Sequence, residues 1–296
     1  MSLTSLTPLE AVTRLSPLVI RVLGCNPGLM TLQGTNTYVI GNGPKRILVD
    51  AGERDKPEYV KLLTSVIENE KIWGFDHIVI THWHHDHIGG LQNVVNVIEP
   101  GFTVWKYPTK EDSDNDTSED VAIKMESLSD GQKLTTAGAT LRVIHAPGHT
   151  TDHICLYLEE ENTLFSGDSI LGEGSTTFET LYDYMKSLQK LLSYNAQKIF
   201  PAHGPVIENP TAKITEYIQH RNLRESQILS ILHGQNYKPI EPCEIVKKLY
   251  NDTPALLLPA AERNVIHHLE KLNTEGKVEV TDGKWSLIRD VDQSKM

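Results

Sequence analysis

The sequence is poor in cysteine and has no long apolar run. Its three cysteines, Cys25, Cys155 and Cys243, lie far apart and include no Cys-x-x-Cys pair. This argues against a disulfide framework and indicates a reducing compartment. No apolar stretch approaches the length of a membrane-spanning helix, and no charged start followed by an apolar core marks a secretory signal. We therefore expect a protein without a membrane partner.

An excess of positive charge is also missing. Lys and Arg number 28 against 39 Asp and Glu, which gives a formal net charge of -11 and argues against a uniformly basic protein that coats nucleic acid. The net acidity lies in residues 1–210, because residues 211–296 carry equal numbers of acidic and basic side chains. Bound metal ions would neutralise part of this acidity, so the charge does not exclude an anionic substrate.

The densest chemical signal is the run 81–90, Thr-His-Trp-His-His-Asp-His-Ile-Gly-Gly. It follows a short apolar stretch, 77–80, that predicts a buried strand. Imidazoles and a carboxylate without thiolates are typical of a catalytic zinc, iron or manganese site, whereas packing alone gives no reason to bury them together. The candidate ligands are His82, His84, Asp86 and His87. We expect His77 and His85 to be structural.

The rest of the chain alternates strands and helices. Strands are predicted over 18–23, 35–40 and 46–50, a helix over 58–68, strands over 140–145, 153–158 and 164–168, a helix over 178–192 and a strand over 198–204. The acidic segment 108–120 lacks apolar anchors and predicts a surface loop.

Three more candidate ligands, His149, Asp168 and His203, each lie next to a glycine where an apolar run breaks. Alone, a His or Asp in such a place is more often a turn residue. Together with the first run they make seven ligands, which is enough for two metal ions.

These motifs resemble those of the metallo-beta-lactamase superfamily. The matching features are Asp50 at a strand end, the run from 81 to 87, Pro-Gly-His-Thr around His149, Ser-Gly-Asp at 166–168 and Pro-Ala-His-Gly around His203. The resemblance implies an α/β fold, an αββα sandwich over residues 18–210. Flavodiiron members usually carry a carboxylate where His84 stands, so the resemblance favours two Zn²⁺ ions per chain.

The resemblance also implies a role for each ligand. His82, His84 and His149 would hold one metal, and Asp86, His87 and His203 the other. Asp168 would bridge the two ions, and Asp50 would orient a ligand without binding metal. The nucleophile would be a metal-bound hydroxide, with Asp86 as the catalytic residue that orients it.

Within the superfamily, the likeness is closest to a branch of metal-dependent endoribonucleases. It rests on the stretches 22–28, 31–38, 166–168, 170–174 and 181–184, and it continues into the C-terminal part. It implies metal-dependent cleavage of single-stranded RNA in the mitochondrial matrix. We separately expect a monomer with no obligate protein partner. A cytoplasmic location is the alternative, because the first 24 residues are as typical of an ordinary extension as of an import signal. A thioester hydrolase like glyoxalase II and a non-catalytic RNA-binding module are the alternative functions.

We expect two domains, 1–210 and 211–296. The second is predicted to contain helices over 214–232, 242–250 and 259–273, then a hairpin around Asp282-Gly283, and resembles a winged helix-turn-helix module. Such modules often place a helix against nucleic acid, for which the third helix offers Arg263 and Lys271. A lid that only shapes the cleft is the other interpretation. Further candidates for the substrate cleft are Asn36, Tyr38, Glu173 and Tyr182, although turn or core positions would suit them equally.

Overall fold

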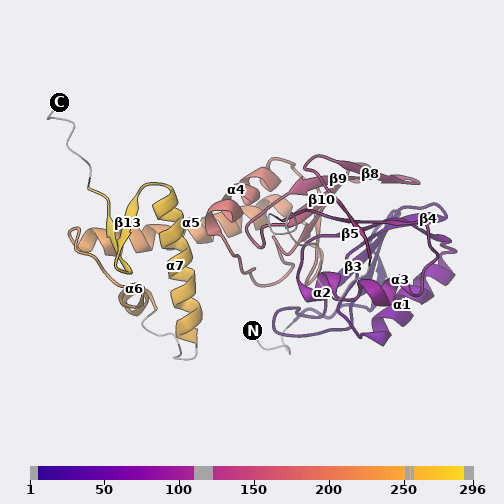
Figure 1. Cartoon of the computed structure of the whole chain (residues 1–296), viewed down its shortest axis with the longest axis horizontal. Helices are drawn as coiled ribbons and strands as arrows, with labels where there is room; N and C mark the ends of the chain where they lie inside the picture. Colours follow the sequence, from indigo (N-terminus) through magenta and orange to yellow (C-terminus); the bar gives the residue numbers. More distant parts are fainter. Residues whose placement is uncertain (1–5, 110–122, 251–253, 255–256, 290–296) are drawn as a thin grey trace.

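The structure, a computed structural model, describes residues 6–109, 123–250, 254 and 257–289. A large part holds two β-sheets, and a smaller helical part is joined to it by one long helix, α5 (Pro210–Gly234) (Figure 1). Most of the acidic segment 108–120 lies outside the described residues. Within the described ranges, no helix is both long and apolar enough to cross a membrane.

The first sheet has seven strands in sequential order. Neighbours are antiparallel from β1 to β4 and parallel from β4 to β7. Its strands are β1 (Val12–Arg14), β2 (Val19–Leu23), β3 (Asn36–Ile40), β4 (Lys45–Val49), β5 (Gly74–Ile80), β6 (Thr103–Lys106) and β7 (Met125–Ser127). The helices of this half are α1 (Pro57–Asn69), α2 (His85–Ile88) and α3 (Leu91–Val95).

The second sheet has five strands in the order β12-β11-β10-β9-β8. All neighbours are antiparallel except β11 and β12, which are parallel because α4 (Leu181–Leu192) connects them. The strands are β8 (Lys133–Thr136), β9 (Ala139–His145), β10 (Ile154–Leu158), β11 (Thr163–Gly167) and β12 (Lys198–Pro201).

Residue alternation along the strands builds four layers. In β3, Tyr38 and Ile40 face the core between the two sheets, whereas Val39 faces the helices on the outside, as the two-residue period of a strand requires. Tyr59 and Leu63 of α1 cover the outer face of the first sheet. On the second sheet the covering helices are α4 and the start of α5. This is the predicted αββα sandwich.

The C-terminal part has its own core. It contains α6 (Pro242–Leu249), α7 (Leu258–Thr274) and the hairpin of β13 (Val278–Thr281) and β14 (Lys284–Leu287). The predicted three helices and two-stranded wing are therefore present. Helix α5 belongs to both cores: Ile214 and Ile218 pack against the sandwich, and Ile228 and Leu232 pack in the C-terminal core. Helix α5, which begins at Pro210, is thus shared between the two parts, and the expected division at residue 210 stays a prediction.

Candidate metal centre

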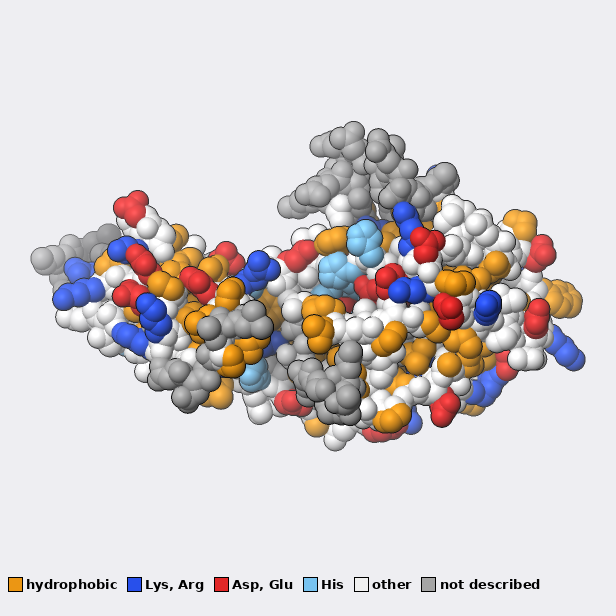
Figure 2. Space-filling model, turned by 90° about the horizontal axis from the view of Figure 1, so that it is seen from below, with side chains coloured by type: hydrophobic (Ala, Val, Ile, Leu, Met, Phe, Trp, Pro, Cys, Tyr) orange, Lys and Arg blue, Asp and Glu red, His pale blue; other side chains and the backbone are white. Residues whose placement is uncertain are grey.

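The seven predicted ligands come from four places at one edge of the sandwich. Strands β5, β11 and β12 each end just before ligands, and the turn between β9 and β10 carries another. Because the two sheets pack face to face, these chain ends meet at one edge of the sandwich. Histidine side chains gather beside acidic ones at the surface of the larger part (Figure 2).

The first group consists of three imidazoles and one carboxylate: His82, His84, His149 and Asp168. Nδ1 of His84 lies 2.9 Å from Nε2 of His82 and 3.1 Å from Nε2 of His149. Nε2 of His149 lies 3.4 Å from Oδ2 of Asp168. Four donor atoms therefore converge on one small volume.

The second group consists of Asp86, His87 and His203. Nε2 of His87 and Nε2 of His203 lie 3.2 Å and 3.3 Å from Oδ2 of Asp86. The other carboxylate oxygen of Asp168, Oδ1, lies 3.5 Å from His87 and 3.2 Å from His203. Asp168 thus presents one oxygen to each group.

These donors fit a pair of divalent ions. Ligands about 2.0–2.1 Å from a tetrahedral ion are separated from one another by roughly 3.3 Å, which is close to the distances above. Nε2 of His87 and Oδ1 of Asp168 are buried and have no hydrogen-bond partner, a costly arrangement unless an ion completes it. Nitrogen and carboxylate donors without sulfur suit zinc.

The imidazoles divide into two electrostatic classes. Burial, together with neighbouring imidazoles, holds the pKa of His82 well below its usual range and lowers the pKa of His84 to about 4. Burial also acts to lower the pKa of His203, but Asp168 outweighs it and raises that pKa to about 9. Asp86 and the other carboxylates likewise raise the pKa of His87 against the effect of burial. The carboxylates are therefore concentrated on the second group.

Outer contacts fix the ring orientations. The Nδ1–H of His87 donates to Asp50 at 2.8 Å, and Asp50 also accepts from the backbone N–H and hydroxyl of Thr81. The Thr81 hydroxyl in turn lies 3.1 Å from Nδ1 of His82. Asp50 has a φ of 61°, an uncommon conformation for a residue other than glycine. Asp50 thus lies outside both candidate ligand groups and is hydrogen-bonded to a member of one of them, and its orienting role stays a prediction.

Two glycines let the chain reach the site. Gly148 has a φ of +131°, and a Cβ there would lie 2.3 Å from the backbone of Tyr184. Gly167 has a φ of +50°, and a Cβ there would lie 2.5 Å from Nε2 of His153. Each precedes a ligand, so backbone freedom and close approach place His149 and Asp168.

Three buried residues support the site without having been predicted to do so. Thr35 donates from its hydroxyl to Oδ2 of Asp86 at 2.8 Å. His153 accepts the backbone N–H of Asp168 at 3.0 Å. Thr176 places its hydroxyl 3.3 Å from Nδ1 of His149. For Thr35 and His153 the only sequence signal was a polar residue at the edge of an apolar strand, which is too common to single out, and Thr176, in the segment between β11 and α4, carried no signal.

Two of the predicted cleft residues prove to be internal. Tyr38 is 2% exposed and donates to the carbonyl of Pro201 at 2.6 Å, and Asn36 is 1% exposed. The Asn36 amide donates to the carbonyls of Pro201 and Gly204, on either side of His203. These contacts correct the prediction that both residues line the cleft, because their polar groups hold the His203 loop.

Glu173 and Lys271 are engaged elsewhere. The carboxylate of Glu173 accepts from Thr7 and from Gln33. Lys271 is 8% exposed and pairs with Glu225 and Glu275, so its expected contact with RNA is also corrected.

Tyr182 and Arg263 remain accessible. Tyr182 is half-buried, and the Lys186 ammonium lies 3.9 Å from its ring centroid; Arg263 is exposed on α7. His85 is exposed, and His77 accepts a hydrogen bond from Trp105. Neither histidine belongs to a ligand group, in agreement with the structural roles predicted for them.

The chain belongs to the metallo-beta-lactamase superfamily, whose family model matches residues 30–203. A second model, the beta-lactamase associated winged helix domain, matches residues 242–285.

The chain is 49% identical to the "Beta-lactamase-like protein 2 homolog" of Drosophila melanogaster, over 92% of this chain and 94% of that protein. It is 34% identical to "Atrochrysone carboxyl ACP thioesterase dmxR1" of Cryptosporiopsis sp. (strain 8999), over 96% of this chain and 89% of that protein. A beta-lactamase domain protein from Burkholderia ambifaria shares the fold, with a TM-score of 0.77 at 17% identity over 96% of each chain. The molecule is therefore a superfamily hydrolase with a candidate metal site and a winged helix domain.

Proposed function

We propose that this hydrolase is a zinc-dependent endoribonuclease that cleaves single-stranded RNA. The observation that carries the proposal is the division of Asp168 between the two ligand groups, at 3.4 Å from His149 and 3.2 Å from His203. Two ions sharing one carboxylate would lie side by side. Such a pair supplies a nucleophilic water at neutral pH and stabilises charge on both the attacking and leaving oxygens of a phosphodiester.

The chain's own residues would prepare this site. Asp50, through Thr81 and His87, keeps two imidazoles oriented. Thr35 fixes the carboxylate of Asp86, so that this catalytic residue can orient the attacking water. Because these contacts exist before substrate arrives, little reorganisation is needed during the reaction.

The winged helix domain supports a nucleic acid substrate. Modules of this type often contact nucleic acid through a helix, and Arg263 on α7 is exposed for such a contact. We further propose that the protein acts in the mitochondrial matrix, which localisation of a tagged full chain would test. We also propose that it acts as a monomer.

Thioester hydrolysis is the second candidate. It is favoured by the 34% identity to a relative named as an acyl carrier protein thioesterase. The same metal site would serve, since it also stabilises charge developing on a thioester carbonyl oxygen.

One comparison separates these functions. Zinc-loaded protein is assayed side by side on labelled single-stranded RNA and on S-lactoylglutathione, with the double variant His82→Ala and Asp168→Ala as control. RNA cleavage that the double variant lacks supports the endoribonuclease. Hydrolysis of the thioester alone supports the second candidate, and RNA binding without cleavage of either substrate supports a non-catalytic module.

A further inference from the structure

Two exposed tryptophans lie at opposite ends of strand β5. Trp73 immediately precedes the strand and is 74% exposed, whereas Trp83 follows it and is 45% exposed. Large aromatic side chains are rarely left this accessible without a partner. The surroundings of the two rings differ, and only those of Trp83 involve the metal centre.

The Trp83 indole lies beside a candidate metal ligand. Its ring centroid lies 4.5 Å from that of His84, with the two rings inclined at 70°. The indole thus rests against a member of the first ligand group while almost half of it stays open to solvent.

This arrangement restricts what Trp83 can recognise. An indole offers one hydrogen-bond donor and no acceptor, so most of its exposed surface is the aromatic face. A flat, polarisable ring is the natural partner for such a face. Because His84 belongs to the ligand cluster, a group resting on Trp83 would belong to a molecule bound at the metal centre.

We propose that Trp83 forms an aromatic subsite that stacks on the nucleobase next to the phosphodiester bond being cleaved. The proposal rests on the endoribonuclease function proposed above. It predicts two properties of the reaction. Stacking accepts any base, so sequence preference is weak, and it needs an unpaired base, so single strands are preferred to duplexes.

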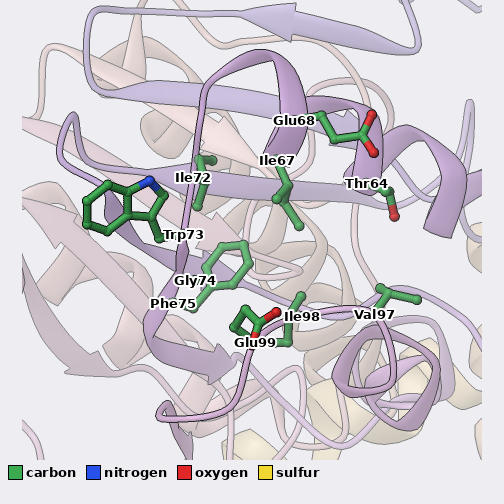
Figure 3. A pocket seen from close by; sticks show the side chains of 10 residues that line it. All are labelled: Thr64, Ile67, Glu68, Ile72, Trp73, Gly74, Phe75, Val97, Ile98 and Glu99. Atoms are coloured by element: carbon green, nitrogen blue, oxygen red, sulfur yellow. The ribbon is translucent and has the colours of Figure 1, made fainter.

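Trp73 provides a matched control. It lies in a surface groove with Ile67, Ile72, Phe75 and Val97, a cavity of about 450 Å³ (Figure 3). This groove is at the end of β5 away from the metal centre, and nothing in the described part of the chain shows what covers it. Removing the Trp73 ring therefore deletes an even more exposed indole without touching the proposed subsite.

The experiment compares the zinc-loaded full chain with its variants Trp83→Ala, Trp83→Phe and Trp73→Ala. The substrates are one single-stranded RNA with a mapped cleavage position and a series in which each nucleotide in turn is abasic. We expect Trp83→Ala to raise KM for intact RNA roughly 5- to 100-fold, and Trp83→Phe to raise it less. One abasic position beside the cleaved bond should raise the KM of the wild type by a similar factor. On that substrate, Trp83→Ala should raise KM no further. Trp73→Ala should match the wild type throughout.

Three results would overturn the subsite: unchanged kinetics in Trp83→Ala, an equal loss on intact RNA and on every abasic RNA, or a loss explained by reduced zinc content. Failure of the wild type to cut any RNA would instead overturn the proposed function. Zinc content, measured on each variant, separates lost stacking from a disturbed His84.

Discussion

The guanidinium of Arg221 donates a hydrogen bond of 3.3 Å to the backbone carbonyl of Thr176. The next carbonyl along, that of Thr177, accepts from Nδ1 of His149 at 2.8 Å. Arg221 also lies over the ring of Phe178, 5.0 Å from its centroid. Helix α5 thus reaches from the winged helix domain to the segment that orients one metal ligand, so the two parts of the chain are mechanically linked at the site.

Replacing Arg221 should therefore weaken metal binding. We expect Arg221→Met to lower zinc affinity about tenfold, because contacts that orient a ligand commonly contribute 10- to 100-fold. Chelator competition measures the affinity. The control is Glu225→Gln, on the same helix as Arg221. It breaks the ion pairs of Glu225 with Lys271 and Lys277 without touching segment 176–178. Equal zinc affinities for the two variants would show that the link does not act on the ligand.

Asp50 should increase the zinc affinity of the second ligand group. In Asp50→Asn the charge that faces Nδ1 of His87 is lost, and we expect zinc affinity to fall about 10- to 100-fold. Asp76→Asn is the control, since Asp76 bonds Thr136 and pairs with Lys45, both away from the metal centre. If Asp50→Asn bound zinc as tightly as the control, the assigned orienting role would be wrong.

Asp168 should be required for zinc binding and for hydrolysis of either substrate, RNA or thioester. Asp168→Ala removes one oxygen from each ligand group, so we expect bound zinc to decrease and hydrolysis of RNA or thioester to fall at least about 100-fold. Metal analysis and activity are measured on the same samples, beside Asp130→Ala, whose carboxylate pairs with Lys190. Full zinc content with full activity in Asp168→Ala would contradict the site described above.

His268 should limit stability in acid. It is fully buried and neither ring nitrogen has a partner, which costs about 1–3 kcal/mol. Burial, followed by the charges of Arg221, Lys271, Arg224 and His220, lowers the pKa of His268 to about 3. The unfolded chain, with a pKa near 6.5, therefore binds a proton that the folded chain excludes. Stability is fully present above pH 6.5 and is lost as pH falls from there towards 3.

His268→Leu tests this directly. We expect the variant to be about 1 kcal/mol more stable at neutral pH, and its advantage to grow as pH falls from 6.5 towards 3. Urea unfolding at several pH values measures both effects. A variant less stable than the wild type at every pH would show that the imidazole has a favourable partner in solution.

The sequence by itself determined the candidate ligands and the strand pattern. The spacing from His82 to His87 and the glycines beside His149, Asp168 and His203 mark the ligands, because clustered polar residues at strand ends have few roles other than binding. Short apolar runs such as Ile47-Leu48-Val49 predict buried strands from local sequence alone. The hairpin around Gly283 is equally local.

Only the tertiary structure decided which residues support the site and which face solvent. Asn36 and Tyr38 are polar residues in a strand, and nothing local shows that β3 is central and that both donate to the Pro201 carbonyl. Thr35 meets Asp86, and Arg221 meets Thr176, across 51 and 45 residues of sequence. Such contacts depend on how the two sheets and α5 pack, and packing is a property of the whole fold.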